Sequence, residues 1–179
     1  INDMIDTSWI HITNPEILPG GKLQTLESDG YQIVLNPSIW SLVIDHMGFL
    51  WVLSEKGIQG YEVIGNNEIT LDPLREYEDE NGEDVPYNFL TSLSYEKGNS
   101  IKVDSQNNKW VITRQGVWVI KESMAYWPSE DGLHPYNSGL LSDDVYDVAF
   151  DNDNGLAYLA TDKGISILQI PFAENPGSA

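Results

Sequence analysis

The chain has 179 residues with 28 acidic and 9 basic side chains, so its formal net charge is −19 and its pI is about 4.1. A surface this acidic repels polyphosphate and anionic lipid, so we expect neither nucleic-acid binding nor adhesion to an anionic membrane. The absence of cysteine excludes disulfides and thiolate sites, and no apolar run approaches the roughly 18 residues of a membrane span.

Residues 1–36 contain three short segments of strand composition. These are SWIHIT (8–13), KLQTL (22–26) and YQIVL (31–35), with a turn at ILPGG (17–21). The first ten residues have no basic region, no apolar signal-peptide core and no initiator Met. We therefore expect N-terminal strands that belong to a further structural unit, in a chain that is processed or is a piece of a longer one.

One pattern occurs three times between residues 37 and 170. Apolar residues alternate up to an aspartate, an aromatic residue follows six or seven positions later, and a glycine stands six positions after the aromatic. The three sets are Asp45, Trp51 and Gly57; Asp104, Trp110 and Gly116; and Asp151, Tyr158 and Gly164.

Each copy of this pattern predicts strand, turn, strand, glycine turn and strand. The alternation is typical of strands, and the aspartate is expected to accept backbone N–H bonds across the first turn. Glycine suits the positive φ of a tight second turn, and the aromatic suits packing between neighbouring sheets. Because no long segment has a helical period, we predict an all-β fold with little or no helix.

The spacing of the copies favours a β-propeller. The aspartates are 59 and 47 residues apart, and four-stranded propeller blades recur at about 40–50 residues. Three blades cannot close a ring, because known propellers have about four to eight. We therefore expect residues 37–170 to form three blades of a larger propeller. The N-terminal strands supply a fourth blade, two chains pair, or the natural protein is longer, and the last is our preferred interpretation.

Two polar segments interrupt or end the repeats. EYEDENGED (76–84) is rich in carboxylates; we interpret it as a solvated loop at a blade edge, with a ligand or cation loop as the alternative. The final segment, PFAENPGSA (171–179), has the composition of a linker.

The segment 137–168 resembles the repeat of bacterial two-component-regulator propellers. The matching positions are Asn137, Ser138, Leu140, Ser142, Val145, Asp151, Gly155, Thr161 and Gly164. The other copies match less fully: Ser54 stands in place of the threonine, and Asn107 and Asn108 stand in place of the turn glycine. The resemblance implies a periplasmic or cell-surface location, as in sensors of hybrid histidine kinases and in proteins of the type IX (Por) secretion system.

Metal and catalytic patterns are weak in this sequence. The histidines, His11, His46 and His134, have no ligand spacing, and we predict no catalytic residue, metal or cofactor. Residues 151–155 (DNDNG) resemble the start of a calcium loop, but Asp162 at the twelfth position is too short to replace the usual glutamate. We interpret this segment as a structural turn, with calcium as the alternative.

Aromatic residues in the stretch 124–139, which we expect to be a long loop, are the candidate ligand contacts. They are Tyr126, Trp127, His134 and Tyr136, and loops on a rigid scaffold often carry binding residues. Four tryptophans, Trp9, Trp40, Trp118 and Trp127, are not explained by the repeat. Packing between blades is the interpretation we favour for them, and a sugar-stacking surface is the alternative.

These observations favour a non-catalytic recognition module of an exported protein, with a glycan or a protein as its ligand. The alternative is a lyase or hydrolase that acts on polysaccharide with a carboxylate, tyrosine or histidine at the channel mouth. Adjacent carboxylates such as Asp143 and Asp144 do not decide between the two, because 28 acids in 179 residues produce such pairs without catalysis.

Overall fold

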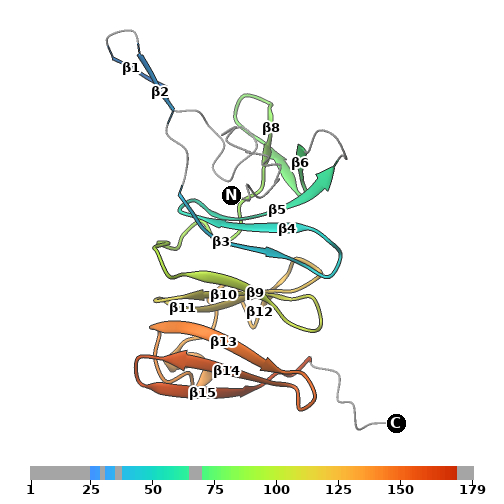
Figure 1. Ribbon diagram of the computed structural model, residues 1–179, viewed down its shortest axis with the longest axis vertical. Helices are drawn as coiled ribbons and strands as arrows, with labels where there is room; N and C mark the ends of the chain where they lie inside the picture. The colour runs from blue at the N-terminus through green and yellow to red at the C-terminus, as the bar shows by residue number, and fades with distance from the viewer. Residues whose placement is uncertain (1–24, 29–30, 35–37, 65–69, 173–179) are drawn as a thin grey trace, which may run out of the picture.

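The chain is arranged as antiparallel sheets that stack along the longest axis of the molecule (Figure 1). The computed structural model describes residues 25–28, 31–34, 38–64 and 70–172. Three of its sheets correspond to the three copies of the repeat, and we call them blades 1, 2 and 3. The predicted all-β architecture is confirmed.

In each blade the strands lie side by side in chain order from one edge of the sheet to the other. Blade 1 consists of β3 (Ile39–Ile44), β4 (Leu50–Ser54), β5 (Gly57–Ile64) and β6 (Thr70–Pro73). Blade 2 consists of β9 (Ser100–Val103), β10 (Lys109–Thr113), β11 (Gly116–Ile120) and β12 (Tyr126–Trp127). Blade 3 consists of β13 (Val145–Asp151), β14 (Leu156–Thr161) and β15 (Gly164–Gln169).

Two hairpins and one helical turn complete the described structure. β1 (Thr25–Ser28) pairs with β2 (Tyr31–Val34), and β7 (Glu76–Glu78) pairs with β8 (Asp84–Pro86). The acidic segment 76–84 is therefore a hairpin, and the helical turn is α1 (Pro135–Ser138). No helix in the described part of the chain is long and apolar enough to cross a bilayer.

The predicted N-terminal strands are described only in part. The segments 22–26 and 31–35 overlap β1 and β2, whereas 8–13, with Trp9 and His11, lies outside the described residues. Residues 173–179 of the predicted linker lie outside them as well. That residues 1–36 belong to a fourth blade, and that the chain ends in a linker, stay predictions.

The glycine of each repeat begins the third strand of its blade. Gly57, Gly116 and Gly164 have φ values of 126°, 125° and 126°, a left-handed region that side chains with a Cβ rarely adopt. The hydroxyl three residues earlier donates to the glycine carbonyl at each turn, from Thr113 to Gly116 (2.9 Å) and from Ser54 to Gly57 (3.2 Å). Serine therefore makes the same bond as the threonine of the family pattern.

The hydrophobic core consists of two layers that lie between blades. The layer between blades 1 and 2 contains Trp51, Leu53, Ile58, Ile101, Val111 and Trp118. The layer between blades 2 and 3 contains Trp110, Ile112, Val117, Val148, Ala157 and Leu159. Burying a side chain of this size stabilises a protein by about 1.5–3 kcal/mol, so packing between blades holds the stack together.

Each repeat aromatic points toward the blade that follows it. Trp51 is 1% exposed and Trp110 is 0% exposed, and each packs in the layer on the C-terminal side of its blade. Tyr158 is the equivalent residue of blade 3, and it is only half-buried. On the same face of blade 3, Ile165 and Ile167 are 66% and 63% exposed. We call this surface the open face.

Candidate functional site

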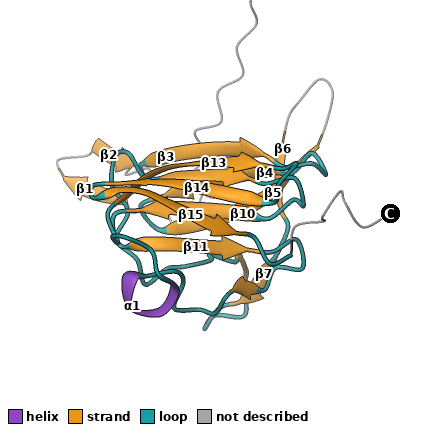
Figure 2. Ribbon diagram, turned by 90° about the horizontal axis from the view of Figure 1, so that it is seen from below, coloured by secondary structure: helices purple, strands orange, loops and turns teal. Residues whose placement is uncertain are grey.

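The first turn of every blade lies at one end of the strands, to the right in Figure 1. These turns span residues 45–49, 104–108 and 151–155, and we call this end the aspartate end. The long segments 86–99 and 128–144, which connect successive blades, belong to the opposite end, which we call the loop end. α1 lies there, to the left in Figure 2.

Asp45 organises the first turn of blade 1. Its Oδ1 accepts the backbone N–H groups of Met47 (2.9 Å) and Phe49 (3.1 Å), which confirms the predicted turn. Its Oδ2 accepts the indole N–H of Trp51 at 2.9 Å. The aspartate and the aromatic of the repeat therefore act as one unit, in which the turn holds the ring of the following strand.

A buried ion pair joins this turn to blade 2. The Lys109 ammonium lies 2.9 Å from Asp45 Oδ2, and the two side chains are 3% and 1% exposed. The same ammonium donates to the Asn107 carbonyl at 2.8 Å and lies 4.8 Å from the centre of the Trp51 ring. Every partner of this cation is thus fixed in place by a turn or a strand.

The surroundings of Asp45 favour its ionised form. Burial by itself raises the pKa of a carboxyl group, but the bonds from Lys109, Trp51 and the Phe49 N–H, with the lysine charge, outweigh burial here. The pKa of Asp45 is therefore lower than its ordinary value. The ion pair is intact at neutral pH.

A second contact joins the same two turns. The backbone N–H of His46 donates to Asn107 Oδ1 at 2.8 Å, across 61 positions of sequence. Asn107 has a φ of 63°, a conformation that asparagine tolerates better than most residues. This explains why asparagine can stand where the family pattern has a turn glycine.

The other two aspartates have different partners. Asp104 Oδ2 accepts the Trp110 indole N–H at 2.8 Å and also binds the Asn108 amide. Asp151 binds the backbone and side-chain N–H groups of Asn154, and the extra residue in its turn separates it from Tyr158 by seven positions. The residue before the aromatic is Lys109 in blade 2 but Ala157 in blade 3, so blade 3 has no equivalent of the buried cation.

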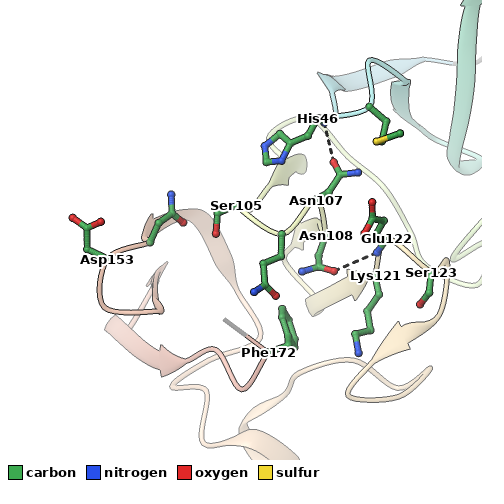
Figure 3. Close-up of a pocket in the computed structure, with 12 residues that line it drawn as sticks. His46, Ser105, Asn107, Asn108, Lys121, Glu122, Ser123, Asp153 and Phe172 are labelled. Carbon is green, nitrogen blue, oxygen red and sulfur yellow. Dashed lines mark hydrogen bonds between the residues drawn. The ribbon is translucent and has the colours of Figure 1, made fainter. Parts of the chain in front are cut away.

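The aspartate end contains an open groove of about 970 Å³ (Figure 3). It is lined by the first turns of the three blades, by the turn after β11 and by Phe172. Four of the lining side chains are amides: Gln106, Asn107, Asn108 and Asn152. The volume is within the range of about 300–1,000 Å³ that is usual for small-molecule sites.

The polar groups of the groove differ in how far they are already bonded. Asn108 is fully engaged, because its amide donates to Asp104 and its Oδ1 accepts the Glu122 N–H at 3.3 Å. Asn107 is 5% exposed, and its amide N–H₂ has no partner among the described residues. The side chain of Gln106 likewise has none among them, so these two groups are available to a ligand.

Three charged side chains also line the groove. They are Lys121, Glu122 and Asp153. The Lys121 ammonium lies 5.4 Å from the centre of the Phe172 ring. One cation and two anions give the lining a net charge of −1.

Two of the candidate contacts predicted from the sequence, Tyr126 and Trp127, are half-buried and form strand β12 rather than a loop. The Tyr126 hydroxyl accepts the Leu90 N–H at 3.4 Å. Trp127 packs 6.4 Å from Trp110 and 5.1 Å from Phe172, measured between ring centres. Both side chains therefore take part in packing around blade 2.

The other two predicted contacts, His134 and Tyr136, lie at the loop end, away from the groove. His134 Nδ1 is 2.6 Å from Asp143 Oδ1, and its Nε2 is 2.7 Å from the Asp131 carbonyl. Tyr136 stacks on the imidazole at 4.9 Å and is 76% exposed. The four candidates are thus not brought together as one surface.

The favoured interpretation of the unexplained tryptophans is consistent with the described ones. Trp118 is 4% exposed, and its indole N–H donates to the Glu130 carbonyl at 3.0 Å. Trp40 packs half-buried against the layer between blades 1 and 2. Trp118 is therefore too buried to offer a ring face to a sugar.

In the described part of the chain, no three histidine or carboxylate side chains are placed to hold a metal ion. Strand β14 carries Asp162 to the loop end, away from Asp151, so a twelve-residue calcium loop between them is not formed. Ion binding by the 151–155 turn alone stays a prediction.

The sequence analysis did not identify the groove. Its lining includes the first turns of successive blades, which are 47 to 61 positions apart, and each amide looks like an ordinary turn residue where it stands. One signal was present: Asn107 and Asn108 replace a turn glycine in a single copy of the repeat. A departure from a repeat at one position suggests a local role that the other copies lack.

No protein-family model matches the sequence, and no curated protein matches it significantly. Similarity is found among solved structures. PorZ, an essential bacterial surface component of the type-IX secretion system of Porphyromonas gingivalis, matches with a TM-score of 0.59 and 26% identity. The match covers 83% of this chain but 19% of PorZ, so this chain spans about a fifth of that protein.

Two further solved structures match more distantly. The extracellular domain of the hybrid two-component system BT3049 from B. thetaiotaomicron has 22% identity over 84% of this chain and 24% of that chain, with a TM-score of 0.37. Virginiamycin B lyase from Staphylococcus aureus has 12% identity over 75% of this chain and 42% of that chain, with a TM-score of 0.33. The described sheets, together with the match to PorZ, show that the described part of this chain contains β-propeller blades.

Proposed function

We propose that this chain is a segment of an exported propeller that recognises a ligand without converting it. The match to PorZ, a surface component, supports an exported location, periplasmic or at the cell surface. Propeller blades hold their turns on a rigid scaffold, and recognition is what such a scaffold supplies most directly. The ligand is a glycan or a protein.

The observation that carries this proposal is the double link between the first turns of blades 1 and 2. The buried Lys109–Asp45 pair and the bond from His46 to Asn107 fix both turns before any ligand arrives. A surface that is already ordered loses less conformational entropy on binding, so more of the contact energy becomes affinity. Two fixed turns beside an open groove suit recognition.

The open face supports the proposal that further blades adjoin blade 3. The C-terminal faces of blades 1 and 2 are covered by the next blade, whereas Tyr158, Ile165 and Ile167 are partly or largely exposed. The C-terminal face is therefore covered in blades 1 and 2 and uncovered in blade 3. A further blade of the same repeat is the occupant that fits it.

One observation favours the alternative of a polysaccharide-acting enzyme. His134 and Asp143 form a close imidazole–carboxylate pair at the loop end, with the exposed Tyr136 beside it. Such a pair is a common source of a general base. Here, however, the second ring nitrogen faces the Asp131 carbonyl, so both nitrogens already have partners.

The experiment that tests the proposal compares binding with turnover. The purified chain is run in gels that contain soluble polysaccharides and is then incubated with each one that retards it. We expect retardation without new reducing ends or unsaturated products. Product formation that Asp143→Asn abolishes would establish the enzyme instead.

The exported location has its own test. Intact cells of the producing bacterium are treated with protease, and the native protein is followed by immunoblot in whole cells and after release of the periplasm. We expect digestion in intact cells or recovery in the periplasmic fraction. Recovery with the cytoplasmic fraction would contradict the proposal.

A further inference from the structure

The groove at the aspartate end has a chemical character that narrows its ligand. Among its lining groups, the amides of Asn107 and Gln106 have hydrogen-bonding atoms with no partner among the described residues, and Ser105 adds a hydroxyl. Amides and hydroxyls both donate and accept. A ligand that matches them needs donors and acceptors at short intervals over its whole surface.

Asn107 is the most firmly held of these polar groups. It is 5% exposed, and its Oδ1 is held by the His46 N–H, so the side chain cannot turn away. Its two amide hydrogens have no partner among the described residues, and the nitrogen that carries them is not one of the buried, unpaired side-chain atoms of that part of the chain. A donor that is held beside the groove and is not used within the described part of the chain can hydrogen-bond a ligand that enters the groove.

The charge of the groove points to an uncharged ligand. Lys121 is its one cation among the described lining residues, against Glu122 and Asp153. The whole chain carries −19, and its field repels an anionic ligand from every side. A cationic ligand would find only the two carboxylates, with Lys121 opposing it.

The shape of the groove is a poor match to a peptide. Peptides are usually bound along a strand edge or by apolar pockets for their side chains. This groove is lined by turns, and its apolar side chains are Met47 and Phe172. Polar groups spaced along turns, with one aromatic surface, suit a polyhydroxylated chain better.

We propose that the groove binds an uncharged oligosaccharide, with the Asn107 amide and the Gln106 side chain as its main hydrogen-bonding partners. This inference rests on the proposed recognition function and assigns it a site and a ligand class. It also moves the site from the loop end, where His134 and Tyr136 lie, to the aspartate end of the blades. The links from Lys109 and His46 hold the Asn107 turn in position for the ligand.

The test is a titration of the full chain, labelled with ¹⁵N, with uncharged hexasaccharides of glucose, mannose, galactose and arabinose at millimolar concentration. We expect at least one of them to shift backbone signals of residues 105–108, 121–123 and 152–153 and to leave those of 134–139 unchanged. Hexagalacturonate and a pool of uncharged decapeptides are the anionic and peptide controls.

Variants locate the binding energy. Asn107→Asp keeps the acceptor for His46 and removes the amide donor, and Gln106→Ala removes the second group. We expect each to weaken binding of that hexasaccharide by about three- to tenfold, as for one lost hydrogen bond. Asn81→Asp, with the same change of charge in the β7–β8 hairpin, and Tyr136→Ala should leave the affinity unchanged. Thermal unfolding checks that each variant is folded. If a variant does not fold, the titration of the wild-type chain still tests the inference.

Each contrary outcome overturns the inference in a recognisable way. Shifts confined to 134–139, or an affinity lost only in Tyr136→Ala, would place recognition at the loop end and leave the proposed function standing. Preference for hexagalacturonate or for the peptides would overturn the ligand class. No shift with any uncharged hexasaccharide would overturn the inference outright, whereas the proposed function fails if the gel and product assays show turnover or if the protein is recovered with the cytoplasmic fraction.

Discussion

At the scale of single residues, the aspartate of the repeat does more than shape a turn. In blades 1 and 2 its carboxylate accepts both backbone N–H groups and the indole N–H of the tryptophan six positions later. Trp51 and Trp110 can therefore be completely buried without leaving a polar atom unpaired. In blade 1, Asp45 also neutralises a buried lysine of the next blade, and so one side chain links turn, strand and neighbouring sheet.

Asp45→Asn should lower the free energy of unfolding by about 3–5 kcal/mol, because the Lys109 ammonium remains buried without its counter-ion. Guanidinium chloride unfolding followed by tryptophan fluorescence measures the loss. The matched control is Asp151→Asn, whose carboxylate is bonded only within its own turn, and its loss should be below about 1 kcal/mol. Equal losses in the two variants would show that the ion pair contributes nothing specific.

The double variant Asp45→Asn/Lys109→Met separates the pair from the turn. Replacing both members of a buried ion pair by groups without charge is often nearly neutral. We therefore expect the double variant to recover most of the stability that Asp45→Asn alone loses. Additive losses would mean that the two side chains act independently.

The stability of the chain should depend on pH through Asp45. Its pKa is lower in the folded chain than in the unfolded one, so its stabilisation is complete above about pH 4 and is lost as the pH falls through the folded pKa. Unfolding curves between pH 2 and pH 7 should show this loss, and it should be much smaller in Asp45→Asn. An unchanged pH profile in that variant would contradict the assignment.

Asp147 contributes to the same acid region in a different way. The hydrogen bond from Lys102 lowers the pKa of this carboxyl against a smaller opposing effect of burial, but the side chains of Lys102 and Asp147 are 40% and 60% exposed. Salt screens such exposed pairs. Added salt should therefore reduce the contribution of Asp147 to the acid loss and leave that of the buried Asp45 in place.

At the scale of elements, the glycine turns connect the blades to the segments that join them. The N–H of Gly116 donates to the Asp143 carbonyl at 2.9 Å, and Val117 exchanges backbone bonds with Leu133. The blade-connecting segment 128–144 is therefore bonded along the start of β11. The equivalent turn of blade 1 is bonded through Ile58 to Phe89 in the same manner.

Gly116→Ala and Gly164→Ala form a matched pair, because their φ values are 125° and 126°. Both substitutions should cost about 1–3 kcal/mol in backbone strain. A Cβ at Gly116 would also lie 2.8 Å from His134 Cε1 and 2.9 Å from the Leu133 carbonyl, whereas at Gly164 the nearest atom is 3.8 Å away. Gly116→Ala should therefore lose about 1–3 kcal/mol more, as in other overpacked sites.

Denaturant unfolding of both variants gives this difference, and amide signals of residues 131–143 report whether the connecting segment moves. Those signals should shift in Gly116→Ala and stay in place in Gly164→Ala. Equal stability losses would show that strain at the glycine, and not the contact with the connecting segment, sets the cost.

At the scale of the whole molecule, apolar layers between neighbouring blades hold the sheets together. The layers between blades 1 and 2 and between blades 2 and 3 contain the fully buried side chains Trp51, Trp110, Ile58 and Val117. Basic residues of blade 2 add contacts in both directions, from Lys109 to blade 1 and from Lys102 to blade 3. Blade 2 is thus covered on both faces, whereas the open face of blade 3 has exposed isoleucines.

The open face should make the isolated chain associate at high concentration, because its exposed isoleucines lie next to each other on one face of strand β15. The double variant Ile165→Lys/Ile167→Lys should shift the chain toward monomer in sedimentation velocity experiments. Its unfolding free energy in dilute solution should change by less than about 1 kcal/mol, because both side chains are exposed.

Tyr136→Lys provides the control, since Tyr136 is exposed at the loop end and does not belong to the open face. It should leave the association unchanged. If the isoleucine variant associates as strongly as the wild type, the open face does not mediate the association. The proposal of an adjoining blade then loses its main support.

The sequence by itself determined the strands, the turns and the repeat, because those depend on neighbours along the chain. Alternation marks the strands, aspartate bonds its own turn, and glycine meets a backbone requirement wherever it stands. Hence the spacing placed the turns at Asp45 and Gly57 and Trp51 in the strand between them, whereas Tyr158, the equivalent of Trp51 in blade 3, is half-buried and not packed between two sheets. The resemblance to propeller repeats followed from the same local pattern, and the blade fold confirms it.

The tertiary structure alone decided which residues meet. Stacking the blades brings Lys109 to Asp45 and Asn107 to His46, across about 60 positions of sequence, and it turns Tyr126 and Trp127 into packing residues. A side chain has no sequence signal for a partner on another blade, because the distance between them is set by how whole sheets pack. The groove is the product of that packing, and so it could be found only in the folded chain.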